Sequence, residues 1–210
     1  CLHFFGKVFY PLVCAFLAIF CLVASNRVDA NCKLIKARER LQESKLHLRI
    51  DPNRPDPALL EQARRILGRG GILAYPTETV YGLGVDAFDE AALERLFQLK
   101  GRAPDQPVSL LVRDLEMLEE VARDVTPQAR RVLETFLPGP LTAVLHAHPS
   151  LPARVTGGTG KVGVRISSHP LIPLLFTVFP HPITTTSANR SGHPPAAKAE
   201  QVAGAFPQGI

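Results

Sequence analysis

The spacing of apolar positions predicts alternating helices and strands along most of the chain. Between residues 56 and 67, apolar side chains recur every three or four positions, which places them on one face of a helix. The short apolar run at residues 72–75 predicts a buried strand, and residues 108–112 are also predicted to form a strand. Helices are also predicted at residues 90–100, 115–122, 127–136, 170–179 and 199–205, and strands at residues 142–145, 162–166 and 183–186.

Two of these helices carry start signals. Asp89 is a predicted N-cap, and Thr126 is another, with Pro127 suited to the first helical position. Because helices and strands intermix throughout, the chain is predicted to be an α/β protein with helices packed on a central sheet. The elements do not follow a regular strand–helix–strand alternation, so we expect a mixed sheet.

The N-terminal residues form a leader that differs from the rest. Residues 12–24 are unbroken apolar residues preceded by Lys7, a pattern that resembles a signal peptide and is short for a membrane span of about 20 residues. Three interpretations stay open: an export signal, a membrane anchor, or upstream translated sequence that is not native, which we favour. We expect residues 1–32 to be this leader, residues 33–49 a polar connector, and residues 50–210 the main domain, truncated at its C-terminus.

Composition separates the leader from the main domain further. All four cysteines lie in the first 32 residues, which excludes a disulfide framework, a cysteine-ligated zinc site and a catalytic thiol in the main domain. Residues 1–45 hold 7 Lys and Arg against 3 Asp and Glu, whereas residues 46–210 hold 17 against 16. The basic character of the chain therefore comes largely from the leader and is no sign of nucleic-acid binding by the main domain.

A hydroxyl- and glycine-rich segment follows the strand predicted at 72–75. Residues 75–84 read YPTETVYGLG, with Thr77 and Thr79 offering hydrogen-bond donors and acceptors at alternate positions. Gly82 and Gly84 are expected to let the backbone approach a ligand closely. The alternative is a strand end with a glycine turn.

Cations and polar side chains form three further candidates. Lys100 and Arg102 flank a glycine and could bind phosphate or carboxylate oxygens. The alternative is that they are favourable cations at a helix C-terminus. Ser187 and Asn189 lie on one side of an extended segment after a predicted strand, which could contact a ligand or form a capped turn. Arg165 stands in an apolar strand and needs an anionic partner, either an internal carboxylate or that of a ligand.

Known catalytic and metal-binding signatures are missing from the sequence. It contains no GxxxxGK[ST] loop, no GxGxxG and no GxSxG, and its histidines show no metal-ligand spacing. No metal site made of protein side chains is therefore identified. The residue types alone favour a ligand with several anionic groups and do not name a reaction.

In this order, the segments PTETVYGLG, KGR, PGPLT, VGVR followed by His169-Pro170, and SANRSG resemble the YrdC/Sua5 family of threonylcarbamoyl-AMP synthases. The resemblance covers roughly residues 50–206. It implies an open, twisted mixed sheet with helices packed on it. It also implies that L-threonine, bicarbonate or CO2, and ATP give threonylcarbamoyl-AMP and pyrophosphate, for the N6-threonylcarbamoyladenosine modification at position 37 of tRNA.

The resemblance also implies residue roles, partners and a location. Mg2+ is expected to assist at the ATP phosphates, downstream threonylcarbamoyl-transfer proteins are the expected partners, and the cytoplasm is the expected location, with a membrane contact only if the leader is native. Ser167-Ser168 stand where a proline-containing stretch is common, which we expect to affect loop shape and not charge. The implied roles are catalysis for Lys100 and Arg102, L-threonine binding for Thr79, Arg165 and Ser187, and nucleotide binding for Lys100, Arg102, Gln106 and Asn189.

Three rival functions are considered beside this one, and one of them, an exported protein with an unrelated role, conflicts with substrates that are found in the cytoplasm. The first is a non-catalytic module that binds double-stranded RNA or tRNA, which the net charge of +1 on residues 46–210 argues against. The second is the carbamoyltransferase domain of hydrogenase-maturation proteins, which shares the fold. Those proteins carry acylphosphatase and zinc-finger regions upstream, and neither is seen in the leader.

Overall fold

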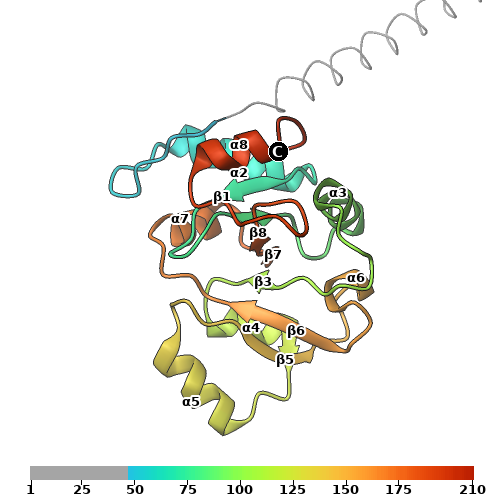
Figure 1. The fold of residues 1–210 in the computed structure, drawn as a ribbon. Helices are drawn as coiled ribbons and strands as arrows, with labels where there is room; N and C mark the ends of the chain where they lie inside the picture. The colour runs from blue at the N-terminus through green and yellow to red at the C-terminus, as the bar shows by residue number, and fades with distance from the viewer. Residues whose placement is uncertain (1–46) are drawn as a thin grey trace, which may run out of the picture. The chain divides into compact units, whose positions relative to one another are not determined.

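Helices and strands intermix along residues 47–210, the part of the chain that this computed structural model describes (Figure 1). These residues belong to one compact unit. The leader expected at 1–32 and the connector expected at 33–49 lie outside the described residues, except for residues 47–49. Within residues 47–210, no helix is both long enough and apolar enough to cross a membrane.

The elements agree with the predicted pattern in kind and order. The helices are α2 (Pro57–Gly68), α3 (Glu90–Lys100), α4 (Leu115–Val121), α5 (Pro127–Phe136), α6 (Ala153–Thr156), α7 (Leu171–Val178) and α8 (Ala199–Ala205). The strands are β1 (Leu73–Tyr75), β2 (Gly82–Gly84), β3 (Leu110–Leu111), β4 (Ala122–Arg123), β5 (Ala143–Ala147), β6 (Lys161–Arg165), β7 (Ile183–Thr184) and β8 (Thr186–Ser187). The pattern of apolar positions did not predict α6, β2 or β4.

Local capping explains where four of the helices begin. The side chains of Asp56, Asp89, Asp114 and Thr126 each accept a hydrogen bond from a backbone N–H in the first turn of α2, α3, α4 and α5, respectively. The predicted caps at Asp89 and Thr126 are therefore confirmed. Gly101 ends α3 in the left-handed conformation, at a φ of 62°, which glycine adopts at little cost.

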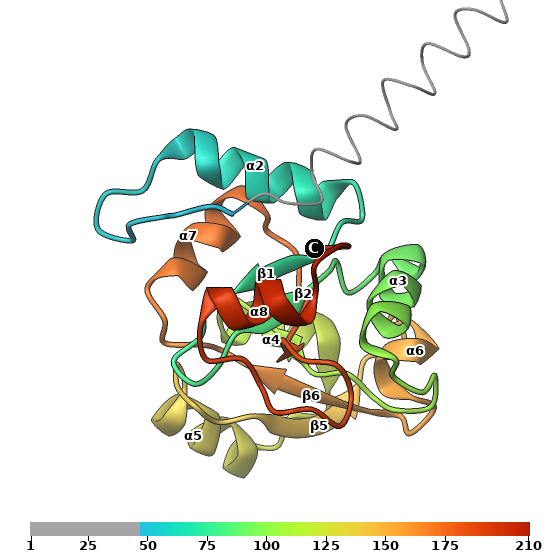
Figure 2. The ribbon, with the colours of Figure 1, turned by 45° about the horizontal axis from the view of Figure 1, so that its top comes forward.

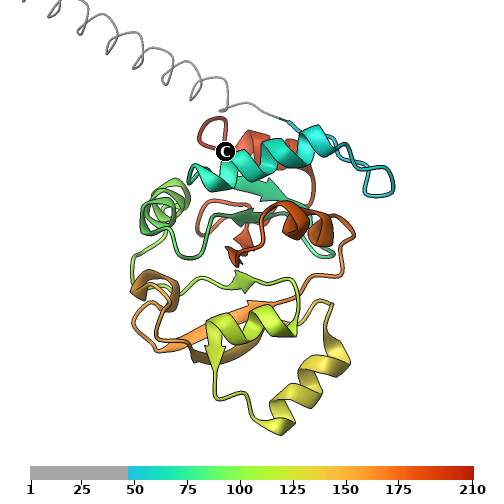
Figure 3. The same ribbon diagram turned by 180° about the vertical axis from the view of Figure 1, so that it is seen from behind.

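The strands form two sheets. Three antiparallel strands lie in the order β1-β2-β8, and five strands lie in the order β4-β5-β6-β3-β7. In the larger sheet β3 and β6 run parallel and the other pairs run antiparallel, so the mixed sheet is confirmed. Opposite views show α4 on one face of the larger sheet and α2 beside α7 near the smaller one (Figures 1 and 3).

The strand predicted at 183–186 is two strands in two different sheets. β7 pairs with β3, whereas β8 pairs with β2. Between them, Thr185 donates its backbone N–H to the carbonyl of Ser109, 2.7 Å away. The chain thus crosses from one sheet to the other at Thr185, and Figure 2 shows α8, which follows β8, lying over β1 and β2. A single run of β-branched residues, Ile183 to Thr186, cannot reveal this crossing, because the two halves differ only in their partner strands.

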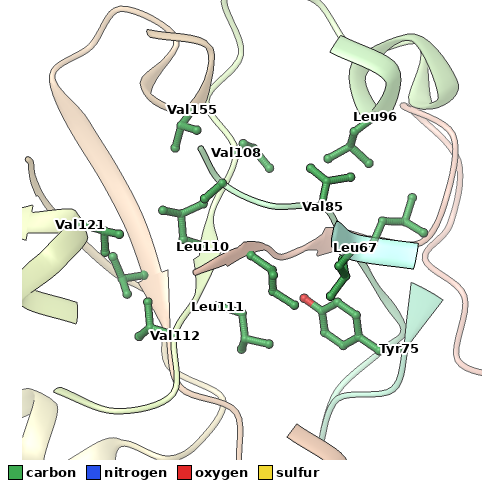
Figure 4. Packing of buried hydrophobic residues seen from close by; sticks show 14 of the residues in the cluster. Leu67, Tyr75, Val85, Leu96, Val108, Leu110, Leu111, Val112, Val121 and Val155 are labelled. Atoms are coloured by element: carbon green, nitrogen blue, oxygen red, sulfur yellow. The ribbon is translucent and has the colours of Figure 1, made fainter. Parts of the chain in front are cut away.

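Side chains from both sheets meet in one hydrophobic core (Figure 4). Leu110 and Leu111 of β3 are fully buried, as is Val85 after β2. Leu67 of α2 and Tyr75 of β1 pack against the same cluster. This shared core holds the loops after β1, β6 and β8 in fixed positions.

Tyr75 explains why glycines stand on both sides of Leu83 in β2. A Cβ on Gly84 would lie 2.8 Å from Tyr75 Cε1 and 3.1 Å from Ile183 Cδ1, and a Cβ on Gly82 would lie 3.1 Å from the same ring. The Tyr75 hydroxyl donates to the carbonyl of Thr184, 2.8 Å away, which fixes the ring. The Tyr75 ring therefore accounts for both glycines, and the expected approach of a ligand to their backbone stays a prediction.

Adding one methyl group at Gly84 should therefore destabilise the protein. We expect Gly84→Ala to lower the free energy of unfolding by about 1–3 kcal/mol, the usual cost of overpacking a core. Gly204→Ala is the matched control, because nothing lies within 4 Å of a Cβ there and α8 gains a better helix former. Urea unfolding of both variants measures the difference, and a Gly84→Ala variant as stable as the unaltered chain would refute this account of β2.

Candidate active site

Lys100 closes α3 and reaches across to the segment after β8. Its ammonium donates to the carbonyl oxygens of Ser187 and Asn189, the second at 2.9 Å. The residue is only 3% exposed. Burial, and secondarily the charge of Arg102, lowers the pKa of Lys100 to about 8. Lys100 therefore joins α3 to the 187–189 segment through two of its three N–H donors.

Arg102 follows directly, beyond the turn that Gly101 makes. Its Nη2 donates to the carbonyl of Pro107, 2.5 Å away. Burial lowers the pKa of this guanidinium, and its Nε is buried with no hydrogen-bond partner among residues 47–210. Two cations thus lie close together, and no carboxylate of the described residues is bonded to either, which suits an anionic ligand.

Arg165 has an internal carboxylate as its partner. Its Nη2 donates to Oε1 of Glu78 and also to the hydroxyl of Thr79, 3.1 Å away. The side chains of Arg165 and Glu78 are 14% and 17% exposed, so the ion pair is largely shielded from water. This answers the question that the sequence left open, although the Nε of Arg165 is buried with no hydrogen-bond partner in the part of the chain that the structure describes.

Glu78 is a site residue that the sequence analysis missed. Its second carboxylate oxygen, Oε2, accepts a hydrogen bond from the hydroxyl of Ser167, which is 3% exposed. Burial raises the pKa of Glu78, but the hydrogen bonds from Arg165 and Ser167 outweigh it and hold the pKa below its usual value. A signal was available, because a glutamate in a polar loop is a natural partner for a lone arginine in an apolar strand.

The hydroxyls in the loop after β1 form a turn around Thr77. Its Oγ1 accepts from the backbone N–H groups of Thr79 and Val80 and donates to the carbonyl of Val80 at 2.7 Å. The Thr79 hydroxyl lies 3.1 Å from that of Thr77 and is exposed. The turn therefore presents Thr79 to Arg165 and to solvent together.

Most of the predicted site residues fall into two neighbouring groups. One contains Thr79 and Arg165, and the other contains Lys100, Arg102, Ser187 and Asn189. The two groups are neighbours because Ser187 of β8 pairs with Gly82 of β2. Gly82 is the first residue of β2, and the loop just before it carries Thr79. Gln106 lies on an exposed turn, and the structure shows no side-chain hydrogen bond between it and another described residue.

Unpartnered polar atoms concentrate at these groups. Four buried side-chain nitrogen or oxygen atoms of the described residues have no hydrogen-bond partner. Three belong to predicted site residues, namely Nε of Arg102, Nε of Arg165 and Oδ1 of Asn189. Buried polar atoms are costly without partners, so their concentration here indicates that a polar ligand completes the site.

The family model described as Telomere recombination, which groups Sua5, YciO and YrdC proteins, matches residues 65–210. The chain belongs to the Sua5/YciO/YrdC family. A family member from Pyrococcus abyssi named threonylcarbamoyl-AMP synthase is 36% identical over 173 residues, which are 82% of this chain and 47% of that protein. One of the same name from Alkalilimnicola ehrlichii is 43% identical over 143 residues, covering 68% of this chain and 74% of that protein.

A solved family member supports the fold as well. The crystal structure of P. abyssi Sua5 complexed with L-threonine superposes with a TM-score of 0.71 at 38% identity, covering 73% of this chain and 45% of that one. The expected family and fold are thus confirmed. The chain spans about half the length of the P. abyssi protein that it matches.

Proposed function

We propose that this chain is a nucleotidyltransferase that makes threonylcarbamoyl-AMP and pyrophosphate from L-threonine, bicarbonate or CO2, and ATP. The observation that carries the proposal is the set of unpartnered buried atoms on Arg102, Arg165 and Asn189. The names of the family members and the L-threonine bound to P. abyssi Sua5 support the choice of reaction and substrate.

The proposed chemistry needs charge neutralisation and alignment. The amine of threonine adds to CO2 and loses a proton, which gives a carbamate. A carbamate oxygen then forms a bond to the α-phosphorus, and the bond from that phosphorus to the bridging oxygen breaks, so that pyrophosphate leaves with the electron pair. Because both reactants are anionic, cations that hold them in line lower the barrier more than a strong base would.

Each predicted residue has a proposed place in this reaction. Lys100 and Arg102 lie as neighbouring cations and are assigned to the phosphates of ATP, where Lys100 supplies a point charge and Arg102 a fork of donors. Arg165 and Thr79 are assigned to the threonine carboxylate, with Ser187 as a further contact. The nucleotide contacts are assigned to Asn189, whose Oδ1 is buried without a partner, and to Gln106.

The remaining parts of the proposal concern the metal, the partners and the chain boundaries. Within residues 47–210, no group of three or more His, Cys, Asp or Glu side chains could hold a metal ion. We assign Mg2+ to the ATP phosphates, where it neutralises charge. We assign the product to tRNA threonylcarbamoyl-transfer proteins in the cytoplasm, and residues 50–210 to the catalytic domain.

Incorporation of carbonate carbon into a nucleotide tests the proposal. The full chain is incubated with labelled bicarbonate, L-threonine, ATP and Mg2+, and the nucleotides are separated. We expect a labelled product with the mass of threonylcarbamoyl-AMP that forms only with threonine present. A chain that forms no labelled nucleotide, yet binds tRNA with strong salt dependence and no effect of ATP, would support the RNA-binding module instead.

A further inference from the structure

Two polar side chains, those of Ser167 and Glu78, form a hydrogen-bonded chain that ends at the guanidinium of Arg165. The Ser167 hydroxyl donates to one oxygen of Glu78, and Arg165 donates to the other. Ser167 lies two residues after the end of β6, whereas Glu78 lies in the loop after β1. The carboxylate is therefore held at both oxygens, each by a different group.

The Ser167 hydroxyl is itself held in one orientation. Its oxygen accepts the backbone N–H of His169, 3.2 Å away, in the residues that lead into α7. A hydroxyl has one proton to donate, and here that proton goes to Glu78. The adjacent Ser168 is different, because it is exposed and the structure shows no side-chain hydrogen bond for it among the described residues. The two serines therefore make different contacts, and the expectation that they affect loop shape and not charge stays a prediction.

These contacts determine which donors of Arg165 stay available. A guanidinium has five N–H donors, and the two on Nη2 are taken by Glu78 and Thr79. Nε is buried with no partner. The remaining donors can meet a ligand only in the plane that Glu78 and Thr79 impose, so the orientation of the guanidinium is set before a ligand arrives.

We propose that Glu78 and Ser167 are positioning residues for the amino-acid substrate. They fix the plane of the Arg165 guanidinium, so that binding the substrate carboxylate costs less rotational freedom. The inference rests on the proposed function, because it requires Arg165 to receive that carboxylate. Ser167 acts only through Glu78, so its effect should appear in amino-acid binding and not in nucleotide binding.

The matched serines give the sharpest test. Calorimetry on the full chain measures the dissociation constants of L-threonine and of ATP separately, for Ser167→Ala, Ser168→Ala, Ser167→Thr and Glu78→Gln. We expect Ser167→Ala and Glu78→Gln to weaken threonine binding by about tenfold, as expected for the loss of one charge-assisted hydrogen bond, with ATP binding unchanged. Ser168→Ala should bind both ligands normally, and Ser167→Thr, which keeps the hydroxyl, should recover most of the threonine affinity. In turnover, KM for threonine should rise while kcat holds.

Three results would overturn the inference. Equal threonine affinity in Ser167→Ala and Ser168→Ala would show that the Ser167 hydroxyl positions nothing. Tighter threonine binding by Glu78→Gln would show that Glu78 competes with the substrate for Arg165. A parallel loss of threonine and ATP binding in Ser167→Ala, unrelieved in Ser167→Thr, would show a merely structural role. Failure of the proposed function gives a separate result: the unaltered chain itself binds no threonine. That result would overturn both the proposed function and this inference.

Discussion

Replacing Arg165 with alanine should nearly abolish threonine-dependent turnover. We expect KM for L-threonine to rise by about two orders of magnitude, because the variant loses the cation assigned to the substrate carboxylate, while KM for ATP changes little. The structure adds a second effect that the sequence did not predict. Removal of the guanidinium leaves Glu78 without its ionic partner, so the free energy of unfolding should fall by about 1–3 kcal/mol.

The control is the same substitution, arginine to alanine, at a position away from the site. Arg131→Ala removes an exposed arginine from α5 and should leave turnover and stability unchanged. Thermal unfolding of both variants measures how much stability is lost when Glu78 has no ionic partner. Initial rates at varied threonine concentration measure the loss of threonine binding. Threonine-dependent turnover that survives Arg165→Ala would remove Arg165 from the site and would take the proposed threonine subsite with it.

Replacing Lys100 should damage both the reaction and the fold. Lys100→Met keeps the buried aliphatic stem but loses the ammonium that joins α3 to the carbonyls of Ser187 and Asn189. We expect kcat/KM for ATP to fall by about two to three orders of magnitude, as for the loss of a preorganised charge. The free energy of unfolding should fall by about 1–3 kcal/mol, because the part-buried carbonyl of Ser187 and the buried carbonyl of Asn189 lose their donor.

The pH dependence of the unaltered chain should report the same group. Burial lowers the pKa of Lys100 to about 8, so its charge is present below that pH and is lost above it. The kcat/KM for ATP should therefore decline as pH rises through about 8, since this ratio reflects the free enzyme. Lys161→Met, at an exposed position on β6, should preserve both the rate and the profile. A Lys100→Met variant that is less stable but turns over normally would make Lys100 purely architectural.

Local signals made the helices predictable. Asp89 and Thr126 cap their helices through side-chain hydrogen bonds within three residues, and Gly101 ends α3 by its own conformation. These signals depend on neighbouring residues alone, which is why the sequence shows them. Predicted bounds of α2, α3 and α5 agree with the structure to within about a residue for the same reason.

Contacts between distant residues were not predictable in the same way. β2 contains two glycines, which disfavour a strand by propensity, and only the ring of Tyr75 above them explains why they are used. The split between β7 and β8 depends on two different partner strands. The lone arginine in β6 indicated a carboxylate, but its partner Glu78 lies 87 residues away along the chain. Sequence reasoning identified the need for a partner and could not choose among the acidic residues.

Pyrophosphate release by the full chain is the most direct test of the account. The assay supplies ATP and Mg2+ and adds L-threonine and bicarbonate separately and together. The account predicts that release requires both, because the carbamate must form before the α-phosphate is attacked. Release that is independent of threonine, or no release in the presence of both while the chain still binds ATP, would contradict the assignment of Lys100, Arg102 and Arg165 to one reaction.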